Sequence, residues 1–274
     1  MAKRIFTDQL ARNIEVSFPP QKIVSLVPSQ TELLFDLNLK PFISAITKFC
    51  IHPKELVVNM EIVGGTKTIH LDKLASIKPD LIIANKEENT RSEIEEIAKE
   101  FPVWISDIKN LEDALIMIKS VGALTNTEVH ANEIADAITA RFDGLRPMHK
   151  LLKAVYLIWR KPYMSVNRHT FIHDMLQRSG FTNLCAEVNE RYPEISESAL
   201  VALNPDVVLL SSEPYPFAEK HIKELSQILP NCRIELVDGE LFSWYGTRLL
   251  YSPDYFKKLG ERLSNVPTSH APHF

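Results

Sequence analysis

The chain has 274 residues, of which 45% are hydrophobic and 24% charged, and its formal net charge is −4. This composition is typical of a globular protein with one large domain or two of ordinary size. The slight acidity gives no electrostatic reason to expect nucleic acid or an anionic membrane as a partner. Three widely spaced cysteines indicate neither a disulfide framework nor a CxxC zinc site.

The first half of the chain alternates apolar runs with amphipathic segments, which indicates a parallel sheet with helices on both faces. A buried strand is predicted at residues 22–27 and ends at Pro28. The run Ser29-Gln30-Thr31-Glu32 has the spacing of a capping box, which predicts a helix to about Leu37. Further strands are expected at residues 42–47, 81–84 and 103–105, with helices starting at residues 71 and 90.

The middle of the chain reads as two helices, at residues 111–124 and 128–145. At 1.5 Å per residue the second would be about 27 Å long, enough to cross from one lobe to another. The second half then returns to alternation: strands are predicted at residues 153–159, 207–210 and 234–237, with helices at 171–179, 217–229 and 246–263. Residues 265–274 are expected to form a flexible tail.

One segment occurs twice. Residues 71–84 and 197–210 each contain a short amphipathic helix, a Lys/Asn-Pro-Asp turn and an apolar run. Two such α/β units predict an α/β fold of two doubly wound parallel-sheet lobes, joined by a single long backbone helix, with a ligand cleft between the lobes. The expected divisions are an N-terminal lobe at 1–124, a linking helix at 125–147 and a C-terminal lobe at 148–264.

Candidate binding residues follow from the rule that ligands of doubly wound sheets lie beyond the carboxyl ends of the strands. Aromatic rings there suit a flat macrocycle, and arginine can bind a carboxylate or phosphate with two hydrogen bonds. Helix capping is the favoured alternative for Ser29, lobe packing is the alternative for Trp244 and Tyr245, and a solvated side chain for Lys67. The candidates are Pro28, Ser29, Gln30, Cys50, His52, Lys67, Trp159, Arg160, Tyr163, Trp244, Tyr245 and Arg248.

Cys50 and His52 are also weak candidates for a metal site. Alternate residues of a strand share a face, so the pair could bind a metal jointly or act as nucleophile and base. A buried cysteine beside a histidine placed by Pro53 is the favoured alternative, because neither a third ligand nor an orienting acid is evident. His169 and His173 likewise lack a third ligand. No catalytic residue is predicted, and the chain is expected not to be an enzyme.

Four segments in combination resemble a known family: residues 6–12, 23–32, 71–84 and 195–210. They are similar to substrate-binding proteins of ABC importers, of the vitamin B12 and ferric-siderophore type with a helical backbone (class III periplasmic binding proteins). The resemblance implies a non-enzymatic periplasmic or extracytoplasmic monomer. It implies an iron(III)-siderophore, haem or cobalamin as ligand, so that iron or cobalt arrives within the ligand and no cofactor is permanently bound.

The resemblance also implies docking to an ABC transporter permease through one surface carboxylate per lobe. Asp72 corresponds to the first of these, while the equivalent second position is Ser198, with Glu197 one place away. The N-terminus shows no apolar signal core, so a cytoplasmic location is the competing expectation. The alternatives are therefore a cytoplasmic corrinoid, haem or iron-chelate carrier without a permease and, less favoured, a Cys/His-dependent enzyme.

Overall fold

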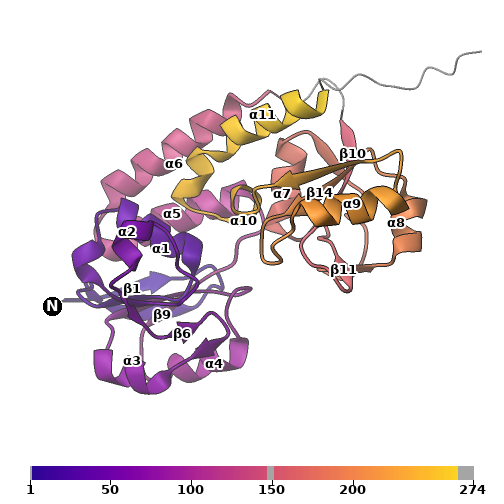
Figure 1. Ribbon diagram of the computed structural model, residues 1–274. Coiled ribbons are helices and arrows are strands. Elements are labelled where there is room, and N and C mark those ends of the chain that lie inside the picture. The colour runs from indigo at the N-terminus through magenta and orange to yellow at the C-terminus, as the bar shows by residue number, and fades with distance from the viewer. Residues whose placement is uncertain (1, 147–150, 265–274) are drawn as a thin grey trace, which may run out of the picture. The chain divides into compact units, whose positions relative to one another are not determined.

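The computed structural model describes residues 2–146 and 151–264, which form two compact units. Unit 1 comprises Met1–Thr139 and Trp244–Arg248, and unit 2 comprises Ala140–Ser243 and Leu249–Phe274. The helix α6 (Glu128–Asp143) begins in unit 1 and ends in unit 2 (Figure 1). The expected tail at residues 265–274 lies outside the described residues.

Unit 1 is built on a five-stranded parallel sheet with the strand order β5-β4-β3-β8-β9. Its strands are apolar and mostly buried because helices cover both faces. In Figure 1, α3 and α4 lie on one face and α1 and α5 on the other. The elements are β3 (Ile23–Ser25), β4 (Ile43–Ile46), β5 (Glu61–Ile62), β8 (Leu81–Asn85), β9 (Val103–Ser106), α1 (Pro28–Asp36), α3 (Leu71–Ile77), α4 (Arg91–Ile97) and α5 (Leu111–Thr125).

Unit 1 also contains short elements outside the main sheet, which the sequence analysis did not foresee. The strands β1 (Ala2–Thr7) and β2 (Asn13–Phe18) form an antiparallel hairpin before the first predicted strand. A second, very short hairpin is formed by β6 (Gly64–Gly65) and β7 (Thr68–Ile69). The remaining elements are the single-turn helices η1 (Lys40–Phe42) and α2 (Lys54–Val57).

Unit 2 repeats this plan with a four-stranded parallel sheet in the order β12-β10-β14-β15. Leu200 and Leu225, from helices α8 and α9, pack on the face that includes Val155 and Leu157 of β10. Tyr156 points to the opposite face, because side chains alternate along a strand. The elements are β10 (Leu152–Leu157), β12 (Phe181–Asn183), β14 (Val207–Ser211), β15 (Arg233–Val237), α7 (Phe171–Arg178), α8 (Glu197–Leu203), α9 (Glu219–Ile228), α10 (Glu240–Ser243) and α11 (Ser252–Ser264), with a small antiparallel pair β11 (Tyr163–Met164) and β13 (Glu194–Ile195). The predicted α/β fold with two parallel-sheet lobes is confirmed.

The sequence repeat has the same local structure in both units. Helices α3 and α8 each end at a residue in the left-handed conformation, Lys78 with φ of 53° and Asn204 with φ of 45°. The Asp after each proline then binds the start of its unit's first sheet strand. Asp80 Oδ2 accepts hydrogen bonds from the backbone N–H groups of Gln21 and Lys22, and Asp206 Oδ2 accepts one from Lys153. The Pro-Asp turn therefore joins two neighbouring strands of each sheet.

Two local predictions are wrong. Helix α1 has Val27 as its N-cap, Pro28 at its first position and no side-chain capping bond, so Ser29-Gln30-Thr31-Glu32 is not a capping box. Proline suits the first turn of a helix because an N–H group there would have no intrahelical partner. The single helix predicted at 246–263 is instead the 3-10 helix η2 (Thr247–Leu250) followed by α11, which begins only at Ser252.

Candidate functional site

The loop after β4 contains Cys50 and His52, but they do not alternate along a strand, since β4 ends at Ile46. Cys50 is buried, and its Sγ lies 3.1 Å from Thr31 Oγ1 and 3.3 Å from Thr47 Oγ1. The His52 ring packs edge-on against Trp244, 5.4 Å between centroids. Burial raises the pKa of the Cys50 thiol, which disfavours the thiolate that a metal ligand or nucleophile requires.

The pKa of each of the other two cysteines is raised as well. Burial also raises the pKa of Cys185, and it raises that of Cys232 to about 11. At pH 8 a thiol with a pKa of about 11 is ionised in only about one molecule in a thousand. In a thiol-reagent assay at pH 8, the native protein is therefore expected to react at least about a hundredfold more slowly than the denatured protein. One rapidly modified thiol in the native state would contradict the raised pKa values of the three cysteines.

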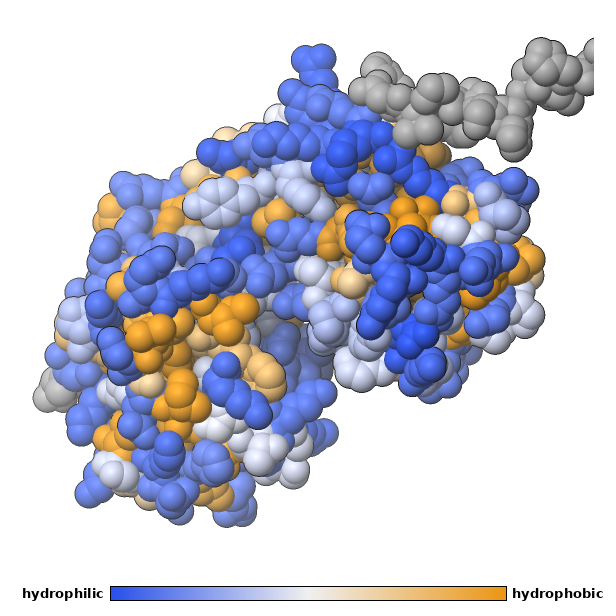
Figure 2. All heavy atoms as spheres, viewed as in Figure 1, coloured by the Kyte–Doolittle hydropathy of each residue, from blue (hydrophilic) through white to orange (hydrophobic). Residues whose placement is uncertain are grey.

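The same loop exposes two apolar residues that the sequence analysis did not select. Phe49 is 50% exposed and Ile51 is 46% exposed, on either side of the buried Cys50. The Phe49 ring lies against the backbone of Gly65, where an added Cβ would come within 3.2 Å of the ring, and Lys48 Nζ lies 5.1 Å from the ring centroid. Figure 2 shows hydrophobic residues reaching the surface of unit 1 among hydrophilic ones.

Pro28, Ser29 and Gln30 form the first turn of α1, directly after β3. Gln30 is fully buried, and its Nε2 donates to Ser106 Oγ at 2.5 Å. Asn85 Nδ2 donates to the same hydroxyl at 3.0 Å. Gln30 therefore joins α1 to the ends of β8 and β9 instead of presenting its amide at the surface.

Two asparagines shape the loop after β8. Asn85 Oδ1 accepts hydrogen bonds from the N–H groups of Glu87 and Glu88, at 2.8 and 3.0 Å. Asn89 Nδ2 donates to the carbonyl of Thr66 at 2.8 Å, which connects this loop to the β6–β7 hairpin. Lys67 lies in the turn of that hairpin and is exposed. Asn85 and Asn89 could have been identified from the sequence as polar residues at and after the end of a buried strand.

The segment Trp244–Arg248 belongs to unit 1 and packs on α1. Arg248 forms a two-pronged ion pair with Glu32, with Nη2–Oε1 at 2.6 Å and Nε–Oε2 at 2.9 Å. Thr247 Oγ1 donates to Asp36 Oδ2, although burial still raises the pKa of Asp36. Gly246 has a φ of +144°, and a Cβ there would lie 2.8 Å from the Ser29 carbonyl oxygen.

The two aromatic residues of this segment are largely buried, Trp244 with 7% and Tyr245 with 6% of its surface exposed. The Arg248 guanidinium lies 4.9 Å from the Trp244 ring centroid. Burial, together with the nearby carboxylates of Glu88 and Glu87, raises the pKa of Tyr245. These rings therefore contribute mainly to packing within unit 1.

In unit 2 the chain turns tightly after β10 and places Trp159 and Arg160 at the end of the sheet. The turn is closed by hydrogen bonds between Ile158 N–H and the Met164 carbonyl and between Met164 N–H and the Trp159 carbonyl. Trp159 is 41% exposed, and its ring packs edge-on against Tyr215, 5.6 Å between centroids. Of the predicted aromatic residues, Trp159 is the one that leaves a large ring surface exposed.

Arg160 is held by a carboxylate of its own unit. Its Nη2 donates to both carboxylate oxygens of Glu224, at 2.8 and 2.7 Å, and its Nε donates to Oε1 at 3.2 Å. The buried Tyr163 hydroxyl donates to Glu224 Oε1 at 3.0 Å. The hydrogen bonds from Arg160 and Tyr163 lower the pKa of Glu224, whereas burial raises that of Tyr163 to about 12.

The two predicted docking residues are exposed in the first turns of equivalent helices. Asp72 is the second residue of α3, and Glu197 is the first residue of α8. The position of α8 equivalent to Asp72 is Ser198, whose hydroxyl lies 2.9 Å from that of the N-cap residue Ser196. The acidic side chains are thus displaced by one residue between the two copies.

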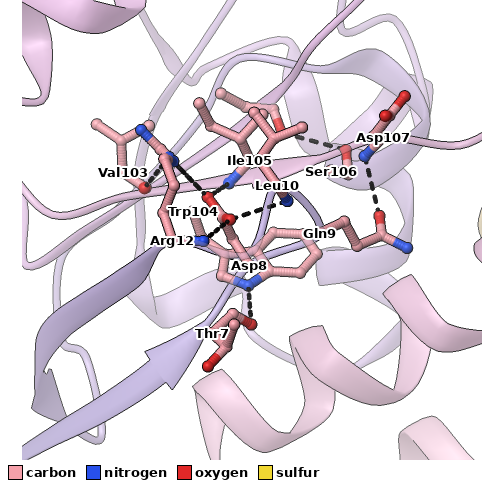
Figure 3. Close-up of polar contacts among 11 residues, drawn as sticks. Thr7, Asp8, Gln9, Leu10, Arg12, Val103, Trp104, Ile105, Ser106 and Asp107 are labelled. Atoms are coloured by element: carbon pink, nitrogen blue, oxygen red, sulfur yellow. Dashed lines mark hydrogen bonds and ion pairs between the residues drawn. The ribbon is translucent and has the colours of Figure 1, made fainter.

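The motif at residues 6–12 is an ion-pair network around the buried Asp8 in unit 1 (Figure 3). Asp8 Oδ2 accepts hydrogen bonds from Arg12 Nε at 2.8 Å and Nη2 at 2.7 Å, while Oδ1 accepts from the N–H groups of Leu10 and Arg12 at 2.9 Å each. Arg12 Nη2 also donates to the carbonyl of Val103 in β9, and Gln9 Oε1 accepts from Asp107 N–H. The motif thereby attaches the N-terminal hairpin to β9 and has a structural role.

Within the described ranges, no group of three or more His, Cys, Asp and Glu side chains is arranged to hold a metal ion. Nor does any helix in those ranges have the length and apolar character needed to cross a membrane.

Comparison with known proteins adds to this geometry. The family model described as "Periplasmic binding protein" matches residues 23–229. An uncharacterized ABC transporter substrate-binding lipoprotein of Bacillus subtilis (strain 168) is 24% identical, over 92% of this chain and 86% of that protein.

Two solved structures share the fold. The periplasmic vitamin B12 binding protein of Vibrio cholerae matches with a TM-score of 0.74 and 18% identity, over 91% of this chain and 100% of that chain. The molybdate periplasmic binding protein of a Haemophilus influenzae ABC transporter, solved with molybdate, matches with a TM-score of 0.76 and 13% identity, over 95% and 91% of the two chains.

Proposed function

The chain belongs to the periplasmic binding protein family, and we propose that it is a receptor for a metal chelate: an iron(III)-siderophore, haem or cobalamin. Membership confirms the predicted resemblance and identifies the chain as a non-enzymatic substrate-binding protein of the ABC-importer class. The proposed ligand is a chelate that carries its own iron or cobalt, so the protein needs to supply only binding surface and hydrogen bonds.

The exposed ring of Trp159 is the observation that carries the proposal. It lies directly after β10, at the carboxyl ends of the sheet strands, where doubly wound folds bind ligands. Phe49 also follows a strand of the main sheet, β4 in unit 1, and is half exposed. Aromatic faces suit a flat conjugated ligand, because stacking buries a large apolar area with little loss of side-chain freedom. Arg160, Tyr163 and Lys67 lie on the same strand-end loops or beside them and stay candidate contacts.

The proposed cellular location and the proposed permease partner follow from the class of substrate-binding proteins. We propose that the protein acts outside the cytoplasmic membrane and delivers its ligand to a permease, as a monomer. Asp72 and Glu197 are the proposed docking carboxylates, and both are exposed. The one-residue displacement of Glu197 relative to Asp72 means that a permease would have to recognise the two units with different geometry.

The test is a titration of the purified protein with cyanocobalamin, haemin and ferric siderophores, followed by ligand absorbance and tryptophan fluorescence. At least one of these chelates is expected to bind more tightly than about 100 µM, which corresponds to roughly −5.5 kcal/mol. Failure of every chelate to reach that affinity would overturn the proposal. Trp159 should report binding, since Trp104 is buried to 1% exposure and Trp244 to 7%.

Replacing Trp159 with alanine is expected to weaken chelate binding by about tenfold to thirtyfold, because an aromatic contact at the centre of a site contributes about 2 kcal/mol. Tyr251→Ala is the matched control, since Tyr251 is a 63% exposed aromatic residue of unit 2 outside the strand-end loops. Equal affinities of Trp159→Ala and the control would remove Trp159 from the site.

A further inference from the structure

Two of the three guanidinium nitrogens of Arg160 are engaged within unit 2. Its Nε and Nη2 hold Glu224 through three hydrogen bonds of 2.7 to 3.2 Å. The side chains of Arg160 and Glu224 are 20% and 35% exposed, so this neutralised pair lies at the surface beside the Trp159 ring.

Glu224 is held in its charged form. It accepts from Arg160 and from Tyr163, and these hydrogen bonds, with Arg160 contributing most, lower its pKa. A ligand carboxylate that bound Nε and Nη2 of Arg160 would have to displace Glu224, and one that bound the remaining nitrogen would lie next to the negative charge of Glu224. An uncharged ligand can stack on Trp159 and leave the pair intact.

The residues around Trp159 do not offset the negative charge of Glu224. The segments that follow β10, β14 and β15 contain two basic residues, Arg160 and Lys161. They contain three acidic residues, Glu213, Asp238 and Glu240. They are therefore acidic even before Glu224 is counted. In unit 1 the other predicted anion-binding arginine, Arg248, is neutralised in the same way by Glu32, and these two side chains are 16% and 12% exposed.

We propose that Glu224 is a specificity-determining residue: by occupying Arg160 beside the exposed Trp159 ring, it makes this protein select uncharged chelates and reject anionic ones. The inference rests on the proposed function and narrows it to one charge class of ligand. Neutral ligands with amide or hydroxyl groups satisfy the surface around Trp159 without displacing an ion pair. Binding of an anionic ligand is disfavoured by the loss of the Arg160–Glu224 hydrogen bonds and by repulsion from Glu224.

The experiment separates charge from chelate type by using two probes of each charge class. Cyanocobalamin and a neutral ferric tris-hydroxamate are the uncharged chelates. Haemin, with its carboxylates, and a trianionic ferric tris-catecholate are the anionic ones, and molybdate serves as a small anion without a chelating ligand. Each is titrated into the wild-type protein, Glu224→Gln and the control Glu219→Gln, which makes the same charge change at an exposed residue of the same helix.

In the wild type the tightest uncharged chelate is expected to bind at least about tenfold more tightly than either anionic one. Glu224→Gln should improve binding of the anionic chelates about tenfold, because Arg160 is released, while Glu219→Gln should leave the ratio within about twofold of the wild type. The gain should shrink at high salt, since it arises from a partly exposed charge.

Several outcomes would overturn the inference. A wild type that binds haemin, the tris-catecholate or molybdate at least as tightly as the uncharged chelates overturns it but leaves a binding function in place. The same conclusion follows if a folded Glu224→Gln variant gains no affinity for the anionic chelates. If no chelate binds more tightly than about 100 µM, the proposed function fails and the inference fails with it. The wild-type comparison decides the question even if Glu224→Gln does not fold.

Discussion

Replacing Asp8 with alanine is expected to lower the free energy of unfolding by about 2–4 kcal/mol, because a buried carboxylate that accepts several hydrogen bonds is lost. The Asp8 side chain is fully buried, and its two oxygens accept four hydrogen bonds of 2.7 to 2.9 Å from Leu10 and Arg12 (Figure 3). Alanine would leave these donors unpaired and would weaken the attachment of the hairpin to β9. Denaturant unfolding followed by circular dichroism measures the change.

The same hairpin provides a matched control. Glu15 forms an ion pair with Lys3, but the two side chains are 53% and 66% exposed, so Glu15→Ala should cost less than about 1 kcal/mol. Asp8→Asn keeps one acceptor oxygen but loses the charge and the second acceptor, and it should lie between the two variants. A loss below about 1 kcal/mol for Asp8→Ala would contradict the role assigned to the 6–12 motif.

Replacing Arg248 with alanine is expected to cost about 3 kcal/mol and to release the Trp244–Arg248 segment from α1. The substitution leaves Glu32, only 12% exposed, without its two-pronged partner, and removes the cation from beside the Trp244 ring. Hydrogen exchange should show the effect as faster exchange of amides in residues 244–248 and in α1 than in the wild type. Unfolding in denaturant should show the loss of stability.

The control for this prediction is Arg91→Ala in the same unit. Arg91 is 91% exposed and pairs with Glu95, which is 58% exposed, so its removal should change stability by less than about 1 kcal/mol. A double-mutant cycle of Arg248→Ala with Glu32→Gln should give a coupling energy above about 1 kcal/mol. Additive effects would show that the two residues do not stabilise unit 1 through each other.

Much of the fold could be predicted because it depends on local patterns. The apolar runs at residues 22–27, 81–84 and 207–210 are strands of buried parallel sheets, and the repeated helix and Pro-Asp turn have the same structure twice. The N-terminal hairpin was missed although its signal was present: Ile14, Val16 and Phe18 alternate with polar residues. The break before α11 also had a signal, since Ser252-Pro253-Asp254 is a typical helix start.

The candidate site was harder to predict because its side chains are used in contacts between distant residues. Ser29 and Glu32 have capping-box spacing, yet Glu32 pairs with Arg248, 216 positions along the chain. Arg160 was selected correctly as a strand-end residue, but its partner Glu224 lies 64 positions away on α9. The spacing of apolar residues indicates which face of a helix or strand a residue occupies. It does not indicate which distant residue its side chain contacts. Phe49 was missed because its neighbours Cys50 and His52 have the more reactive side chains.

The chain crosses from unit 1 to unit 2 in α6, returns to unit 1 for Trp244–Arg248 and then leaves it again. This connectivity has a consequence for synthesis on the ribosome, where the chain emerges from its N-terminus. The first 139 residues emerge with Glu32 and Asp36 still lacking Arg248 and Thr247. Unit 1 can be completed only after most of unit 2 has emerged. A fragment that ends in α6 would therefore lack Trp244–Arg248, the segment that packs on α1.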